Sequence, residues 1–231
     1  MHNRKIVSRE DWLQARQTLL SQEKELTRLQ DQLSQQRRAL PWVAVSQDYR
    51  FQGPSGDVSL RDLFGDCSQL LVYHFMFGPD WQQGCPSCSF WADNYNGIDR
   101  HLQQRDIQLV TVSRAPLQTL LDYRDRMGWD FQWYSSLGSD FNSDFHVSFV
   151  DQPTDIEYNY RTKPYFSDEM PGISAFYKDA DGTVYHTYSC YARGVEIVNG
   201  AYHYMDLAPK GRDEDSLEFS MAWVRRRDEY A

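Results

Sequence analysis

Long apolar runs are missing from this chain of 231 residues, and no stretch approaches the roughly 20 apolar residues of a membrane-spanning helix. An excess of basic residues is missing too. The formal net charge is -9, whereas binding to a nucleic-acid backbone depends on clustered Lys and Arg. The first residues lead into a charged helical pattern without the apolar segment of a secretory signal. We therefore expect a cytoplasmic protein with neither a membrane nor a nucleic-acid partner.

Cysteine is also scarce, with four residues at positions 67, 85, 88 and 190. Such uneven spacing does not suit a disulfide framework, and in a reducing compartment a CxxC pair is catalytic or metal-binding. Zinc needs four ligands, but no second CxxC or close Cys/His pair stands nearby in the sequence. We expect no metal and no organic cofactor, although the fold could bring distant ligands together.

Tight basic clusters are limited to one run, Arg225-Arg226-Arg227, near the C-terminus. Asp228 and Glu229 follow directly and offset its charge. The pattern favours a solvated tail over a binding patch.

Residues 8–40 predict one long helix. Ser8 followed by Asp11 resembles a capping box, and Pro41 supplies the stop. A half-filled apolar stripe recurs every seven residues, at Trp12, Leu19, Leu26, Leu33 and Leu40. A surface helix laid on its own domain would explain it. However, about 30 residues span about 45 Å, so we favour residues 1–40 as an arm that packs on a second copy in a homodimer.

After Pro41 the sequence changes to short apolar and aromatic runs with turn residues between them. The predicted elements are a small hairpin over 49–60, strands over 69–77, 106–113 and 131–135, helices over 86–104, 116–127 and 195–205, and a hairpin over 173–189. Asn94, Asn96 and Gly97 tend to break the helix over 86–104, and no element is assigned to 141–168. A parallel half joined to an antiparallel half predicts an α/β, thioredoxin-like fold for residues 41–231, with a central mixed sheet flanked by helices.

The motif Cys85-Pro86-Ser87-Cys88 lies where the first long strand meets a helix. Unpaired N–H groups at the helix start favour a thiolate, so Cys85 is the candidate nucleophile and Cys88, one turn further, the resolving thiol. Pro86 suits the first helical turn, and Ser87 adds a hydroxyl without charge. Both are expected to border a bound substrate.

Four further residues are candidates for the substrate cleft. Trp81 would offer an apolar contact or gate access, or else simply pack. Arg114 follows a buried strand at the sheet end where such folds gather their sites, so it would steady a thiolate or pair with a carboxylate such as Asp93. Pro171 precedes the hairpin, where this fold places a cis-proline opposite the disulfide, and an ordinary trans proline is the alternative. Met170 would then present its backbone to the substrate.

Longer motifs around these residues resemble a known family. They are the strings YHFMFGPDW (73–81) and GCPSCSFWAD (84–93), with VSRAP (112–116), RMGW (126–129), HTYS (186–189) and DLAPKGRDE (206–214). The chain is similar along nearly its whole length to bacterial thioredoxin-like proteins that are filed as a domain of unknown function and labelled predicted dithiol-disulfide oxidoreductases. The resemblance implies thiol-disulfide exchange at Cys85 and Cys88, with a disulfide-containing protein or small molecule as substrate and an unidentified electron donor.

Two other functions compete with this interpretation. Peroxiredoxins share the fold and place a cysteine at the same junction, but their usual signature has Thr or Ser three positions earlier, where this chain has Gln82. A non-catalytic member would use the cleft beside Cys85 and Pro171 to bind a peptide or small molecule. Two cysteines that merely pack in the core are the simplest alternative.

Overall fold

The computed structural model describes residues 5–151 and 153–230 and divides the chain into two compact units, Met1–Pro41 and Trp42–Ala231. The first unit contains α1 (Arg9–Arg38). The strands of the second are β1 (Val43–Ala44), β2 (Arg50–Gly53), β3 (Gly56–Ser59), β4 (Gln69–His74), β5 (Ile107–Ser113), β6 (Trp133–Ser135), β7 (Asp155–Tyr158), β8 (Arg161–Pro164), β9 (Gly172–Lys178) and β10 (Val184–Tyr191). Its helices are η1 (Asp62–Phe64), α2 (Pro86–Ala92), α3 (Asp99–Gln103), α4 (Leu117–Arg126), α5 (Phe141–Asp144), η2 (Ala192–Val198), α6 (Gly200–Leu207) and η3 (Arg227–Glu229).

Helix α1 begins as the sequence predicts, because the Ser8 hydroxyl accepts a hydrogen bond from the backbone N–H of Asp11 at 3.1 Å. Within Arg9–Arg38, all of which the structure describes, no residue is buried. The predicted stripe is exposed along the helix, and Leu26 keeps 56% of its surface accessible. Pairing of this stripe with a second copy stays a prediction. Among the described residues, no helix is both long and apolar enough to cross a membrane.

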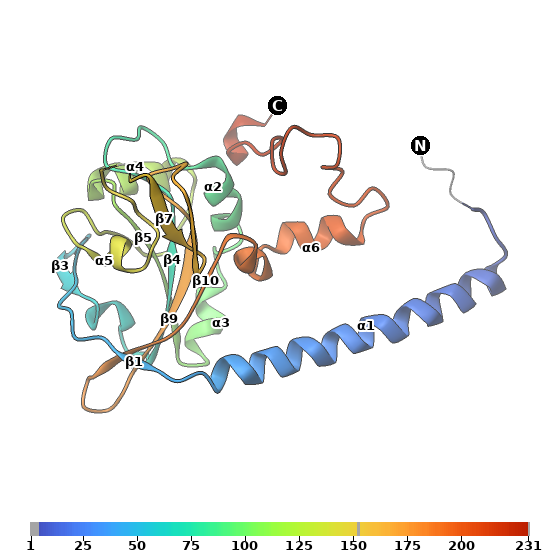
Figure 1. Ribbon diagram of the computed structural model, residues 1–231, viewed down its shortest axis with the longest axis horizontal. Coiled ribbons are helices and arrows are strands. Elements are labelled where there is room, and N and C mark those ends of the chain that lie inside the picture. Colours follow the sequence, from blue (N-terminus) through green and yellow to red (C-terminus); the bar gives the residue numbers. More distant parts are fainter. Residues whose placement is uncertain (1–4, 152, 231) are drawn as a thin grey trace. The chain divides into compact units, whose positions relative to one another are not determined.

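A mixed sheet forms the centre of the second unit, and in the described residues its strand order is β1-β10-β9-β4-β5-β6-β2-β3. Strand β4 pairs in parallel with β5 and antiparallel with β9, which pairs antiparallel with β10. The chain passes from β4 to β5 through α2 and α3, whereas β9 and β10 form a hairpin (Figure 1). These four strands have the thioredoxin-like plan expected from the sequence.

Strand β4 separates two layers of core because successive side chains point to opposite faces of a sheet. Val72 packs into a cluster that contains Phe64, on one face. Tyr73 packs into a largely aromatic cluster on the other face, and that cluster contains Cys88. The core layer that contains Cys88 of the CxxC motif is therefore closely packed before any substrate binds.

The predicted helix over 86–104 is broken into α2 and α3. The Asn94 side chain donates to the carbonyl of Phe90 at 2.9 Å, and Gly97 has a φ of 81°, a conformation that glycine adopts without strain. The predicted helix over 195–205 is likewise divided into η2 and α6. The unassigned aromatic stretch contains α5 and the hairpin β7–β8, which pair with each other outside the main sheet.

A chain of hydrogen bonds links strands β4, β9 and β10 across the buried sheet. His74 Nε2 lies 2.8 Å from Ser174 Oγ, which lies 2.8 Å from Ser189 Oγ, and the ring of His186 completes the chain at 2.7 Å. His74 is 1% exposed, and its ring stacks on Phe141. Burial, followed by the nearby His186, lowers the pKa of His74 to about 3. The core therefore holds this histidine neutral.

This lowered pKa predicts sensitivity to acid. The unfolded chain takes up a proton at His74 near pH 6.5, while the folded chain does so only near pH 3. The contribution of neutral His74 to the free energy of unfolding is therefore complete above pH 6.5. As the pH falls towards 3, this free energy decreases by about 1.4 kcal/mol per pH unit at the steepest. His74→Asn lowers stability at pH 7 but removes this loss. The free energies of unfolding of wild type and variant, measured in urea from pH 7 to 4, should therefore converge.

The control for this prediction is His101→Asn, since His101 is exposed. Its stability should follow that of the wild type at every pH. Parallel curves for His74→Asn and wild type would show that His74 does not titrate as argued.

Candidate active site

Cys85 occupies the junction between β4 and α2. Its backbone N–H donates to the carbonyl of Met76 at 3.1 Å, and its own carbonyl accepts the first helical bond, from the N–H of Ser89, at 2.9 Å. Cys85 is the N-cap residue of α2, and Pro86 begins the helix as predicted. The residue Cys85 is partly exposed and packs against the core cluster, whereas Cys88 is 2% exposed within that cluster. Cys85 is therefore the more accessible of the two cysteines.

A side chain cannot be accommodated at position 84, directly before Cys85. A Cβ there would lie 2.6 Å from the Phe75 ring and 2.9 Å from the Tyr123 ring. Glycine at position 84 therefore allows the backbone to pass close to these two rings, and this close approach constrains the position of the next residue, Cys85.

The two thiols differ in acidity in the direction that the sequence predicts. A hydrogen bond from the Cys88 thiol is the main cause that lowers the pKa of Cys85 to about 7, and the N–H groups of Cys88 and Ser87 add to it against the effect of burial. Burial first, and then the Cys85 sulfur, raise the pKa of Cys88 well above its ordinary value. Near neutral pH the thiolate is therefore favoured at Cys85, while Cys88 keeps its proton.

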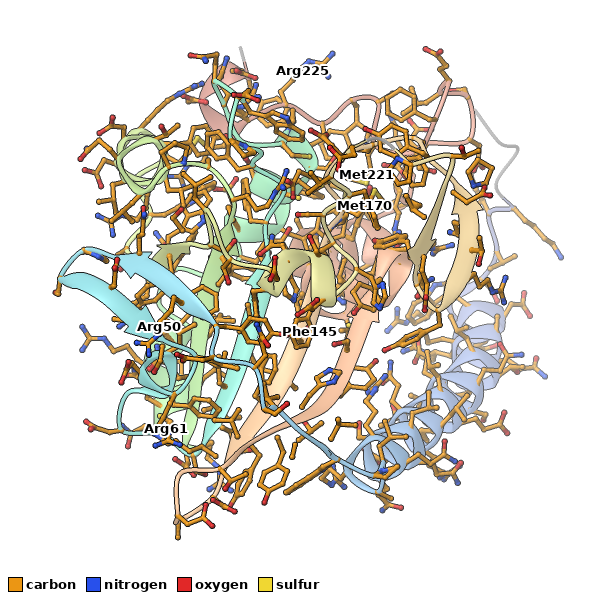
Figure 2. The ribbon with its side chains drawn as sticks, turned by 60° about the vertical axis from the view of Figure 1, so that its left-hand side comes forward. Arg50, Arg61, Phe145, Met170, Met221 and Arg225 are labelled. Atoms are coloured by element: carbon orange, nitrogen blue, oxygen red, sulfur yellow. The ribbon has the colours of Figure 1, made fainter. Side chains whose placement is uncertain are left out.

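An apolar cavity of about 270 Å³ opens beside Cys88. Its walls include Met76, Trp91, Pro171 and Met221, which come from four separate parts of the chain. Figure 2 shows Met221 and Met170 at the same end of the sheet. Ser87 borders the cavity, and its contact with a substrate stays a prediction. The lining also contains one ion pair, Arg193 with Glu196 at 2.8 Å, whose charges offset each other.

Pro171 lies where the fold predicts it, beside Cys88 in the cavity wall, but its peptide bond is trans, as are all peptide bonds in the described residues. Of the two alternatives that the sequence leaves open, the ordinary trans proline is the one found. The Pro171 carbonyl accepts a hydrogen bond from the Tyr158 hydroxyl at 2.8 Å. The Met170 N–H donates to the carbonyl of Val147 at 2.8 Å, so this donor is already used within the domain.

Arg114 pairs with a carboxylate, although not with Asp93. Its Nε donates to Glu169 at 2.7 Å, and Glu169 is 1% exposed. Ser148 donates to the other carboxylate oxygen at 2.6 Å. Burial raises the pKa of Glu169, and the Arg114 charge opposes that rise. This geometry assigns Arg114 to the compensation of a buried charge, and Asp93 instead accepts from the indole N–H of Trp129 at 2.8 Å.

Trp81 folds back over its own loop. A Cβ at position 78 would lie 2.9 Å from Trp81 Nε1, and the ring packs against the core cluster that contains Cys88. Packing is thus the contact that the structure gives to Trp81. Within the described residues, no group of three or more His, Cys, Asp or Glu side chains is arranged to hold a metal ion.

The C-terminal arginine run is not a solvated tail. Arg226 donates to the carbonyl of Gly84 at 2.8 and 3.1 Å, and its side chain is only 14% exposed. Arg227 lies 3.4 Å from Asp93. Figure 1 shows the red C-terminal segment returning to the neighbourhood of α2. Sequence reasoning missed this contact, because a run of three arginines shows charge but not its partner.

A family model described as "Bacterial protein of unknown function (DUF899)" matches residues 1–230. No curated protein matches the chain. Among solved structures, a mutant of peroxiredoxin Q from Xanthomonas campestris is similar, with 10% identity, a TM-score of 0.47, and coverage of 73% of this chain and 98% of the other. For the peroxidoxin BcpB from Mycobacterium tuberculosis these values are 12%, 0.46, 70% and 94%. For a putative thiol:disulfide interchange protein DsbE from Chlorobium tepidum they are 14%, 0.40, 70% and 97%.

The contrast between the two thiols predicts a pH profile for alkylation. The rate of modification of Cys85 by iodoacetamide should rise with a midpoint near pH 7. Cys88→Ala removes the main hydrogen-bond donor, so the midpoint should move towards the value of about 8.5 that an ordinary cysteine has. Cys88→Ser keeps a donor, and its midpoint should fall between the two. Mass spectrometry after peptide digestion measures the rate at each pH.

The matched control is Cys67→Ala, which removes a buried thiol outside the core cluster that contains Cys88 and should leave the midpoint unchanged. A wild-type midpoint at 8.5 or above would contradict the assignment of Cys85 as nucleophile.

Proposed function

Because the chain belongs to the DUF899 family of bacterial proteins, which carries no assigned activity, we propose from its own residues that it is a thiol-disulfide oxidoreductase. Cys85 is the nucleophile and Cys88 the resolving cysteine. The observation that supports the proposal is the pairing of a partly exposed cysteine of lowered pKa with a buried thiol that donates to it. The cytoplasm, predicted from the sequence, is a compartment that keeps such a dithiol reduced.

The reaction proceeds in two exchanges. The Cys85 thiolate attacks one sulfur of a substrate disulfide, the substrate S–S bond breaks, and the departing thiolate takes a proton from water. Cys85 is now part of a mixed disulfide and carries no negative charge. One cause of the raised pKa of Cys88 is thereby removed. Cys88 can then lose its proton more easily and attack Cys85.

The second exchange releases the other half of the substrate as a thiol and leaves a disulfide between Cys85 and Cys88. Two electrons have passed from the dithiol to the substrate. A dithiol reductant, the class to which the unidentified electron donor belongs, returns the protein to its starting state. The same steps in reverse would oxidise a substrate dithiol, so the potential of the partner decides the direction.

The cavity beside Cys88 is expected to accept an apolar part of the substrate. Its volume of about 270 Å³ lies below the range of whole drug-sized ligands and suits one or two side chains. The methionine side chains that line it, Met76 and Met221, are flexible and can adapt to ligands of different shape. We therefore propose that substrate disulfides carry an apolar side chain next to the reactive cysteine.

Trapping tests the first exchange. Cys88→Ser should accumulate a mixed disulfide with insulin, visible as an added chain on non-reducing gels and by mass spectrometry, because the second exchange has no nucleophile. Wild type should catalyse insulin reduction by dithiothreitol, and Cys85→Ser should not exceed the uncatalysed rate. Cys67→Ser should behave as wild type. Full activity in Cys85→Ser, or consumption of hydrogen peroxide but not of disulfides, would overturn the proposal.

The apolar cavity predicts a difference between two peptide disulfides that have Leu or Glu next to the cysteine. Met221→Glu should lower kcat/KM for the Leu peptide about tenfold, since burial of one such side chain is worth about 1.5–3 kcal/mol. The Glu peptide should change far less. Leu207→Glu changes a residue that is 85% exposed and does not line the cavity, and should affect neither peptide. Equal losses for both peptides in Met221→Glu would reject the cavity as a specificity pocket.

A further inference from the structure

Three consecutive arginines near the C-terminus have three different partners. Arg225 donates to carbonyls of its own segment, at 3.0 Å to Ala222 and 2.9 Å to Val224, and lies at the outer edge of the molecule in Figure 2. Arg227 pairs with Asp93. Arg226 alone among them binds the loop that carries the nucleophile, through the carbonyl of Gly84.

The guanidinium of Arg226 donates two hydrogen bonds to the Gly84 carbonyl oxygen, from Nη2 at 2.8 Å and from Nε at 3.1 Å. Its remaining terminal nitrogen, Nη1, pairs with Glu229 at 3.0 Å. The Glu229 carboxylate, which belongs to the same turn, therefore holds the two-pronged guanidinium group, the Arg226 fork, in one orientation. The oxygen that the fork binds is neutral, whereas the Glu229 carboxylate offsets part of the fork's positive charge.

Two aromatic rings constrain the same loop. The Phe75 and Tyr123 rings leave no room for a side chain at Gly84, and the Arg226 guanidinium binds the carbonyl of that residue. The N–H of the peptide between Gly84 and Cys85 is the one that donates to Met76. All three contacts constrain the same peptide plane, from which the Cys85 side chain projects one bond later.

A second pair of contacts fastens the C-terminal segment to the same loop. Arg126, in α4, donates to Asp228 at 2.7 Å and to the side chain of Gln83 at 2.7 Å. Gln83 directly precedes Gly84, so α4 and the C-terminal segment meet over this loop. Further back, Glu214 accepts from the Trp223 indole at 2.6 Å and from the N–H of Met221 at 3.1 Å, which fixes the approach of the segment.

We propose that Arg226 is a positioning residue for Cys85: its fork fixes the Gly84–Cys85 peptide, and its charge favours the thiolate. The proposal rests on the function proposed above and extends it to a segment 141 positions away in the sequence. It also separates two effects. Charge acts on the acidity of the sulfur, whereas the fork acts on the direction in which the sulfur points.

Two measurements on the full-length chain resolve these effects. Alkylation by iodoacetamide against pH reports the acidity of Cys85. Exchange with a peptide disulfide at pH 9, where the thiolate is fully formed, reports its position. Arg226→Gln should raise the alkylation midpoint by about half a pH unit and slow the exchange about tenfold. Arg226→Lys keeps the charge but not the fork, so it should hold the midpoint near that of the wild type and still slow the exchange.

Arg225→Gln is the matched control, since it removes the same charge one residue away and should match the wild type in both measurements. Glu229→Gln keeps Arg226 but loosens its fork, so it should slow the exchange by less than Arg226→Gln does. This variant keeps the test decisive if Arg226→Gln does not fold. If wild type reacts readily and Arg226→Gln or Glu229→Gln matches Arg225→Gln, Arg226 has no positioning role. An unreactive Cys85 in the wild type would instead reject the proposed function itself.

Discussion

The chemistry of the site depends on one hydrogen bond between two sulfurs. The Cys88 thiol is the first cause of the lowered pKa of Cys85, and the Cys85 sulfur is among the causes that keep the proton on Cys88. Each sulfur thus sets the state of the other. The asymmetry requires that Cys88 be more deeply buried than Cys85, since a Cys85 closed to the substrate could not react and an exposed Cys88 would lose the main cause of its raised pKa.

The surrounding fold supplies that asymmetry. Tyr73, on the central strand, lies in the aromatic layer that also buries Cys88, and its hydroxyl points to the Cys88 carbonyl at 3.5 Å. The same layer reaches Gly84, where the Phe75 ring contacts the loop directly before Cys85 and the start of α2. The high aromatic content of the chain therefore has a direct structural consequence. Rigid aromatic rings determine which of the two sulfurs is buried away from water.

Local patterns allowed much of this arrangement to be predicted from the sequence. The β4 run, the hairpin at Gly182 and the cap at Ser8 each depend on neighbouring residues, and each forms near the predicted position. The sequence also predicts which thiol is the more acidic, and the N–H groups at the helix start contribute to that difference, although the Cys88 thiol contributes more. The family resemblance is confirmed over residues 1–230.

The features that could not be predicted depend on partners far along the chain or on conformations without a local signal. Arg114 meets Glu169 across 55 positions, and nothing near Arg114 distinguishes that carboxylate from Asp93. The geometry of the Pro171 peptide bond is not encoded by its neighbours. Arg226 follows the same rule, since its partner is a backbone carbonyl, which every residue possesses.

The burial of Cys88 also imposes an order on the proposed reaction. A buried thiol with a raised pKa cannot compete with Cys85 for an incoming disulfide, so the first exchange has only one available nucleophile. Once Cys85 is joined to the substrate, its negative charge is gone, and the desolvation of Cys88 remains as the obstacle to the second exchange. A substrate side chain in the apolar cavity would exclude water and keep that obstacle in place. In the proposed reaction, release of this side chain would therefore be coupled to the second exchange, and Met221 of the C-terminal segment lines the cavity that it leaves.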